Sequence, residues 1–180
     1  MNSFIQSLTY FRILSAPIIF FLIISDFFGW AFTLTLLASS SDYWDGYLAR
    51  KYDLESVLGS ILDPIADKIL LTFLILALSI SMVSSYIAFI GGMILVREFW
   101  VAALRDINAR GNNLDATKVT LLAKSKTFFQ MVTFLIYILG LYLNITLLIF
   151  IGNFFLFAAL IITLQTGLEY TVSTFKAFKK

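Results

Sequence analysis

Long apolar runs separated by short polar breaks dominate this sequence. Six such runs begin near Tyr10, Phe27, Ile69, Tyr86, Phe128 and Ile145. One helical crossing of a bilayer uses about 20 residues, so 180 residues leave room for six or seven crossings and for no separate soluble domain. The chain is 60% hydrophobic and 13% charged, whereas a soluble domain is about 45–50% apolar and about 25% charged. This chain has too little charge to cover a water-facing surface.

We therefore predict an all-α, polytopic membrane helical bundle. Six transmembrane helices are expected near residues 8–25, 28–50, 57–80, 85–108, 118–142 and 145–170. Several runs reach the length of a crossing only when the polar end beside them is included. No internal repeat or linker is visible, so we expect one domain over residues 1–180. The first run has Arg12 inside it and no small-residue cleavage site after it, which favours a retained helix over a signal peptide.

The charged residues predict the topology. The breaks around 25–29, 81–85 and 143–144 contain no Lys or Arg, so all thirteen basic residues fall on the opposite side or in helix ends facing it. Ten of the eleven acids share that side, Asp26 being the exception. Basic loops stay in the cytoplasm, so we expect both termini and the chemistry to lie there.

Two absent residue types narrow the chemistry. The chain contains no Cys and no His, which excludes disulfides, thiolate metal sites, and nucleophiles or bases of either type. Carboxylates, Lys or Arg, hydroxyl groups and metals with oxygen ligands are left. The net charge of +2 does not favour a nucleic acid as partner.

Four aspartates lie within otherwise apolar helices. Asp42 and Asp45 are three residues apart and share one face of the second helix, and Asp63 and Asp67 are four apart and share one face of the third. A short break joins these helices as an antiparallel hairpin, which can bring the two faces together near the cytoplasmic boundary.

An acidic cluster at this depth requires a counter-charge. An ionised Asp costs about 2.5–3.5 kcal/mol at a helix centre, and Arg50 and Lys68 cannot neutralise four acids. Carboxylate oxygens suit Mg²⁺ or Mn²⁺, and two such ions can hold both oxygens of a phosphoryl transfer. Any one aspartate can equally be explained by an ordinary ion pair or cap, but all four together are hard to explain in that way.

Small residues lie beside these acids. Gly46 follows Asp45, Ala49 comes one turn later, and Gly59 lies one turn before Asp63. Such a strip lets a neighbouring helix, or a slim nucleotide or pyrophosphate, approach the backbone. For each glycine alone, helix packing explains the position equally well.

Together these residues carry a family resemblance. Residues 42–67 read D-x2-D-G-x2-A-R-x8-G-x3-D-x3-D, and this pattern resembles the signature of the CDP-alcohol phosphatidyltransferase family at every fixed position. The segments 8–12, 62–68, 97–105 and 124–131 are similar to the bacterial phosphatidylglycerophosphate synthase branch. The chain departs from the family at Ser3, Ile5 and Gln6, where an Asn-x-Pro-Asn-like motif is usual.

The resemblance implies a reaction. The phosphatidyl group of CDP-diacylglycerol is transferred to sn-glycerol 3-phosphate, giving phosphatidylglycerophosphate and CMP in a bacterial-type inner membrane. It implies two Mg²⁺ or Mn²⁺ ions and, because family members often dimerise, a homodimer. By the same resemblance, the metal ligands are Asp42, Asp45, Asp63 and Asp67, with Asp67 also the catalytic base, and the CDP-binding residues are Asp42, Gly46, Ala49, Arg50 and Gly59. A carboxylate base agrees with the absence of His.

An acceptor that carries a phosphate needs a basic pocket. The candidates are Arg97, Arg105, Lys124 and Lys126, with Glu98 expected to hold one of the arginines. The two arginines are about two helical turns apart and share a face. The positive-inside rule or lipid headgroups explain the two lysines as well.

Other functions stay open at this point. The same superfamily includes enzymes with other acceptors, such as cardiolipin synthase and phosphatidylinositol phosphate synthase. A cation transporter or channel with an acidic mouth is another class, although it predicts acids spread through the membrane depth. A prenyltransferase with acidic metal motifs spaces its acids differently.

Overall fold

Six helices make up the part of the chain that the computed structural model describes. They are α1 (Asn2–Ile24), α2 (Phe28–Lys51), α3 (Val57–Ser81), α4 (Ser85–Arg110), α5 (Leu121–Leu143) and α6 (Thr146–Phe178). The structure describes the backbone of residues 2–51, 57–110 and 121–178, and the side chains of 7–42, 44, 51, 59, 61–110 and 127–177. These helices confirm the all-α prediction.

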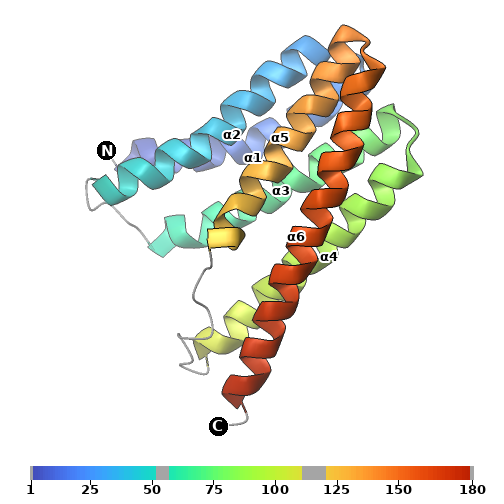
Figure 1. The fold of residues 1–180 in the computed structure, drawn as a ribbon. Coiled ribbons are helices and arrows are strands. Elements are labelled where there is room, and N and C mark those ends of the chain that lie inside the picture. Colours follow the sequence, from blue (N-terminus) through green and yellow to red (C-terminus); the bar gives the residue numbers. More distant parts are fainter. Residues whose placement is uncertain (1, 52–56, 111–120, 179–180) are drawn as a thin grey trace.

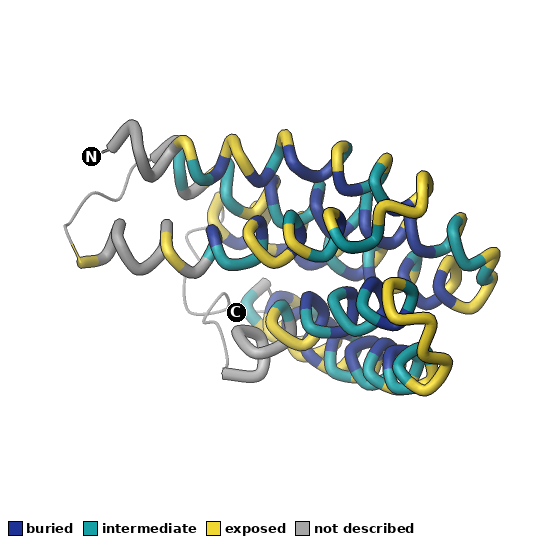
Figure 2. The backbone as a smooth tube through the Cα atoms, turned by 90° about the horizontal axis from the view of Figure 1, so that it is seen from above, coloured by how far each residue is buried: buried dark blue, intermediate teal, exposed yellow. Residues whose placement is uncertain are grey.

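The helices form a ring (Figure 1). α1 packs against α2 and α3, α4 packs against α3 and α6, and α5 packs against α2 and α6. α3 and α5 also meet across the middle. One main apolar core contains buried residues from all six helices, for example Ile19, Ala38, Leu74, Ile94, Phe134 and Leu156. Figure 2 shows buried and exposed positions alternating along each helix, as packing on one face requires.

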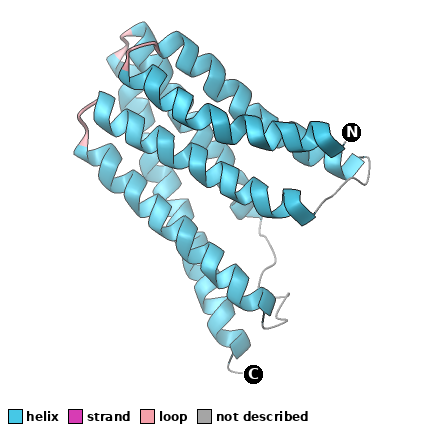
Figure 3. Cartoon of the chain, turned by 180° about the vertical axis from the view of Figure 1, so that it is seen from behind, coloured by secondary structure: helices cyan, strands magenta, loops and turns pink. Residues whose placement is uncertain are grey.

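Three tight turns close one end of the bundle. Each contains one residue with a left-handed backbone: Asp26 with φ of 62°, Val83 with φ of 47°, and Asn144 with φ of 55°. The amide of the following residue donates to the carbonyl five positions back, for example from Phe27 to Leu22 at 2.8 Å. This pattern ends a helix by satisfying its last carbonyl groups. All three turns lie together at one end (Figure 3).

The bundle opens toward the other end. Figures 1 and 3 show the α1–α2 pair and the α4–α6 pair diverging toward the end that carries both termini. Beyond the main core, α4 and α6 share a small apolar cluster of Val101, Leu104 and Tyr170. We call this paired segment the α4–α6 arm.

The predicted helix ranges agree with the structure within a few residues, with two exceptions. α1 begins at Asn2 rather than near residue 8, since no Gly or Pro interrupts the start of the chain. α6 continues to Phe178, past the predicted end near residue 170. The reason is that α4 hydrogen-bonds to its last turns, for example from Asn108 Nδ2 to Thr174 Oγ1 at 2.8 Å.

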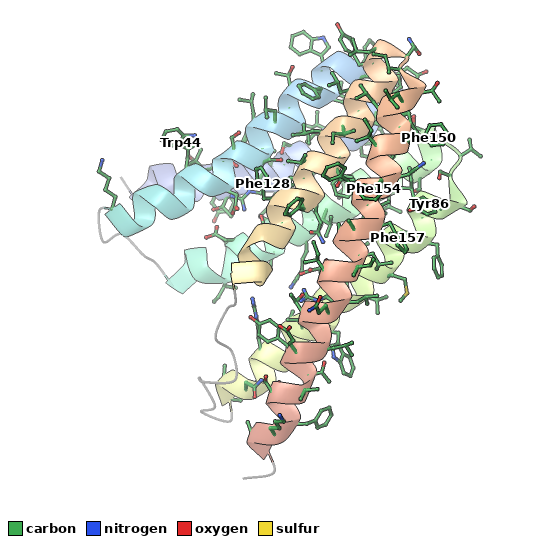
Figure 4. The ribbon with its side chains drawn as sticks, viewed as in Figure 1. Trp44, Tyr86, Phe128, Phe150, Phe154 and Phe157 are labelled. Atoms are coloured by element: carbon green, nitrogen blue, oxygen red, sulfur yellow. The ribbon has the colours of Figure 1, made fainter. Side chains whose placement is uncertain are left out.

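The outer surface suits a membrane. By length and composition, Ser7–Ile24, Ser85–Arg110 and Thr146–Ala177 can cross one, and Thr127–Leu143 is apolar but shorter. Phe150, Phe154 and Phe157 lie along the outside of α6 (Figure 4) and are exposed. A water-facing helix does not carry such a row, so the chain is a membrane protein. Crossing by all six helices remains a prediction.

Candidate active site

Asp42 and Asp67 converge on one buried guanidinium. Arg12 of α1 is fully buried, and its Nη1 lies 2.7 Å from Asp67 Oδ1 and 3.1 Å from Asp42 Oδ1. The two carboxylates come from α2 and α3. The predicted direct packing of these two helices is not among the main helix pairs of the described residues, and α1, which packs against both, brings the carboxylates together instead. Their side chains are 44% and 32% exposed, so each keeps one side open. Arg12 thus provides a fixed positive charge between two acids that would otherwise repel each other.

The same face of α1 also holds the third acid. Thr9 lies one turn before Arg12 and is buried, and its hydroxyl donates to Asp63 Oδ1 at 2.8 Å. Residues three apart share a helix face. α1 therefore fixes three of the four predicted ligands with one short strip of its surface.

Asp67 lies on the wall between two hollows. The first, which we call the α2 hollow, has a volume of about 460 Å³ and is lined by residues of α1, α2, α3 and α5 that include Arg12, Asp42 and Asp67. Trp44 of α2 and Phe128 of α5 line it and are more than half exposed; Figure 4 shows them on these two helices. This hollow combines an acidic floor with an apolar, outward-facing lining.

The second hollow lies between α3, α4 and α5. This α4 hollow has a volume of about 750 Å³, and its charged lining residues are Asp63, Asp67, Lys68, Glu98, Arg105 and Asp106. Besides Asp67, the two hollows share Thr127 and Met131. A carboxylate on a shared wall can contact a group in either space.

The two predicted arginines of α4 have different surroundings. Arg105 is exposed and lines the α4 hollow. Arg97 is buried and lines neither hollow; its Nη2 donates to Thr166 Oγ1 at 2.6 Å and its Nη1 to Glu98 Oε1 at 2.9 Å. The expectation that Glu98 holds one arginine is thus met at Arg97. Arg105 is the one that faces the open space.

Several predicted residues lie outside the described part. The side chains of Asp45, Gly46, Ala49, Arg50, Lys124 and Lys126 are not described, although their backbones belong to α2 and α5. Gly59 lies in the first turn of α3, about one turn before Asp63. The predicted nucleotide strip and the two lysines therefore stay predictions.

The donor set suits a divalent ion. Hard carboxylate oxygens are what Mg²⁺ and Mn²⁺ prefer. Asp42 and Asp67 supply such oxygens, and both use Oδ1 to contact Arg12 Nη1. Within the described side chains, no group of three or more acids is gathered closely enough to hold a metal, and the fourth aspartate, Asp45, is not among them. A complete set of metal ligands would therefore also require Asp45 and Asp63, the latter being the acid that Thr9 contacts.

Thr9 and Arg12 contact the predicted acids, but the spacing of the acids alone does not predict these two residues. By position in the sequence, Arg50 and Lys68 are the basic residues nearest to the acids. Among the described side chains, a counter-charge comes from Arg12, 55 positions before Asp67. One signal pointed to it: Arg12 is the only charged residue in an apolar run that starts near Tyr10, and such a residue needs a buried partner.

Known proteins resemble the chain over most of its length. The model of a family described as CDP-alcohol phosphatidyltransferase matches residues 6–165. The CDP-diacylglycerol–glycerol-3-phosphate 3-phosphatidyltransferase of Rickettsia bellii is 41% identical over 148 residues, 82% of this chain and 77% of the relative. The enzyme of the same name from Rickettsia felis is 40% identical over 153 residues, with the same two shares.

A third relative has a different name. A cardiolipin synthase (CMP-forming)/mitochondrial hydrolase fusion protein of Schizosaccharomyces pombe is 48% identical over 73 residues, 41% of this chain and 12% of that protein. The family match spans both hollows and all the predicted acids. The chain belongs to the CDP-alcohol phosphatidyltransferase family.

Proposed function

We propose that this chain transfers the phosphatidyl group of CDP-diacylglycerol to sn-glycerol 3-phosphate and releases CMP. Two relatives at about 40% identity carry the name of this activity. The structural observation that supports it best is the position of Asp67, between a hollow with acids and an apolar lining and a hollow with Lys68 and Arg105. A transferase with one lipid and one phosphorylated substrate needs two such spaces with a shared reactive wall.

The α2 hollow is the space for the donor. The acyl chains of CDP-diacylglycerol would extend past Trp44 and Phe128 into the bilayer, and its diphosphate would lie near Asp42 and Asp67. Two Mg²⁺ or Mn²⁺ ions on Asp42, Asp45, Asp63 and Asp67 would offset the negative charge of the diphosphate and of the leaving CMP. Gly46, Ala49, Arg50 and Gly59 would line the nucleotide. Arg12 keeps two of the acids in place from behind.

The α4 hollow is the space for the acceptor. The phosphate of glycerol 3-phosphate would bind Arg105, with Lys124 and Lys126 as further candidates from α5. Arg97 does not line this hollow and would contribute by holding Glu98, which does. The acceptor hydroxyl would then face Asp67. Asp67 would take its proton as the oxygen bonds to the phosphorus that carries the diacylglycerol, and the bond from that phosphorus to CMP would break.

The position in the membrane follows from the charges. In the described turns at 25–27, 82–84 and 144–145 there is no Lys or Arg, whereas both hollows lie toward the opposite, basic end. The positive-inside rule then places this end and both termini in the cytoplasm of a bacterial-type inner membrane. The homodimer implied by the family stays a prediction.

One alternative has direct support. The match to a cardiolipin synthase fusion protein favours phosphatidylglycerol as the alternative acceptor, and phosphatidylinositol phosphate synthase is a further member of the superfamily. Because the chain belongs to a family of enzymes, a transporter or channel is not needed to explain its acidic residues. The α4 hollow is lined by Lys68 and Arg105 beside its four acids, and a guanidinium such as that of Arg105 favours an acceptor that carries a free phosphate.

An acceptor panel tests the proposal. The purified protein would receive CDP-diacylglycerol, Mg²⁺ or Mn²⁺, and in turn glycerol 3-phosphate, inositol phosphate, serine or phosphatidylglycerol, with CMP release measured. We expect release with glycerol 3-phosphate and little with the others. Release with another acceptor but none with glycerol 3-phosphate would overturn the proposed specificity.

A further inference from the structure

The last turns of α6 hold α4 through a row of hydrogen bonds. α4 provides the donors and α6 the acceptors: Arg97 to Thr166, Trp100 to Thr171, Arg105 to Tyr170 and Asn108 to Thr174. The acceptors lie at residues 166–174, beyond residue 165, where the family match ends. The acceptors therefore belong to a part of this chain that the family match does not cover, whereas the donors lie within the matched part.

One of these bonds differs from the others. Arg105 is the only donor of the four that lines the α4 hollow. Its Nη2 donates to the hydroxyl of Tyr170 at 3.1 Å, and its Cζ lies 5.1 Å from the centre of the Tyr170 ring. The ring thus supports the guanidinium by a cation–π contact while the hydroxyl fixes its rotation. Two contacts from one side chain restrict an otherwise flexible arginine.

Tyr170 itself is held firmly. Its side chain is 6% exposed and packs with Val101 and Leu104 in the small apolar cluster of the α4–α6 arm. Arg105 is exposed, and an exposed arginine loses much conformational freedom when it binds a ligand. A rigid aromatic partner reduces this cost because the guanidinium is already oriented. The other cation of the hollow, Lys68, lies 6.0 Å from the centre of the ring of Phe99, a side chain that carries no hydroxyl group.

We propose that Tyr170 is a specificity-determining positioning residue: it orients Arg105 in the α4 hollow so that the guanidinium binds the phosphate of the acceptor. This inference rests on the proposed function, because it takes the α4 hollow as the acceptor space. Tyr170 does not touch the reacting atoms. Its effect is on the affinity for a phosphorylated acceptor, and it does not act on the donor.

The test removes one oxygen atom. Tyr170→Phe keeps the ring, the packing and the cation–π contact but loses the hydroxyl that accepts from Arg105. We expect the KM for glycerol 3-phosphate to rise about three- to tenfold, the range for one hydrogen bond to a charged, partly exposed group. The kcat and the KM for CDP-diacylglycerol should stay within about twofold of the wild type.

Thr171→Val is the matched control. It removes a similar α4–α6 hydrogen bond, 3.0 Å from Trp100 Nε1, at the next residue, and Trp100 does not line the α4 hollow. This variant should leave both KM values unchanged. Equal changes in the two variants, or a loss of thermal stability in Tyr170→Phe that lowers kcat and raises both KM values together, would overturn the inference by making Tyr170 merely structural.

A double-mutant cycle with Arg105→Gln shows whether Tyr170 acts through Arg105. In the Arg105→Gln background, Tyr170→Phe should cause no further rise in the KM for glycerol 3-phosphate. The same cost in both backgrounds would contradict the inference.

Failure of the proposed function has a different outcome. It appears in the wild type, as an absence of CMP release with glycerol 3-phosphate. If the wild type uses another phosphorylated acceptor, the same KM ratios for that acceptor decide the role of Tyr170. If the wild type uses only acceptors without a free phosphate, both proposals are wrong.

Discussion

The acidic side of the site, formed by Asp42 and Asp67, and its cationic side, formed by Arg105, are held in different ways. On the acidic side, a fully buried arginine in the main core bridges Asp42 and Asp67. On the cationic side, Arg105 is exposed and rests on Tyr170 in the small cluster of the α4–α6 arm. The acids are therefore part of what keeps the bundle folded, whereas the contacts of the exposed Arg105 contribute little to the stability of the fold. Changes on the acidic side should affect chemistry and stability, and those on the cationic side mainly affinity.

The largest expected effect is at the wall between the hollows. Asp67→Asn should lower kcat by about 10²- to 10⁴-fold, the usual contribution of a positioned base, while binding of a cytidine nucleotide stays measurable. CMP release and nucleotide titration would check the two parts. Asp26→Asn is the matched control, since Asp26 is exposed at the other end of the bundle and Asn tolerates its left-handed backbone. Full turnover in Asp67→Asn would remove Asp67 as the base.

Arg12 tests the claim that the acids are structural as well as chemical. Arg12→Gln leaves Asp42 and Asp67 without their shared cation and should lower the free energy of unfolding by about 2–3 kcal/mol. This is less than the loss of a fully buried pair, because both carboxylates are partly exposed. Arg12→Lys should recover part of it, since an ammonium keeps the charge without the planar fork. Thermal unfolding in detergent measures both.

An exposed ion pair gives the comparison for Arg12. Arg110 pairs with Asp106 at 2.9 Å, but the two side chains are 80% and 59% exposed. Arg110→Gln should therefore cost no more than about 0.5 kcal/mol. If Arg110→Gln and Arg12→Gln lowered the unfolding temperature equally, the burial of Arg12 would not set its ion pairs apart from an exposed pair, and the claim that the acidic side helps to keep the bundle folded would not stand.

The sequence predicted the acidic side in part because its order is local. Spacings of three and four residues put Asp42 near Asp45, and Asp63 near Asp67, on single helix faces. The predicted hairpin contact is not what joins the two helices, because α1 packs against both α2 and α3 and brings Asp42 and Asp67 together. The residues that hold these acids are not local: Thr9 lies 54 positions before Asp63. The helix that packs behind a cluster of acids is determined by the packing of the whole ring. The spacing of one motif carries no information about that packing.

The same reason explains the two arginines of α4. Arg97 and Arg105 share a helix face by spacing, so the sequence predicts one role for both. The structure separates them because α6 packs on that face and its Gly167 leaves room for Arg97: a Cβ atom added at Gly167 would lie 3.0 Å from Arg97 Cγ. Arg105 follows Leu104, a member of the small apolar cluster of the α4–α6 arm, which lies outside the main core. A pattern predicts the face of a residue, but not how far the neighbouring helix extends over it.

Thr9 offers a smaller test of the acidic side. Thr9→Val keeps the shape of the buried side chain and removes the hydrogen bond to Asp63, so it should cost about 1 kcal/mol of stability. Thr9→Ser keeps the hydroxyl and should cost less. We expect CMP release to fall by a few-fold in Thr9→Val, because Asp63 then loses a fixed orientation. Wild-type stability and turnover in Thr9→Val would show that Asp63 is placed by its own helix alone.

The smallest effect is expected far from both sides of the site, at the turn between α3 and α4. Val83 has a φ of 47° and is 91% exposed, and a β-branched residue is strained in this conformation. The equivalent turn positions are Asp26 and Asn144, both types that tolerate it. Val83→Asn should therefore raise the free energy of unfolding by about 0.5–1 kcal/mol and leave CMP release unchanged. A gain in stability that also altered either KM would show that the closed end of the bundle controls the opening at the other end, and the two sides of the site could then no longer be treated as separate from it.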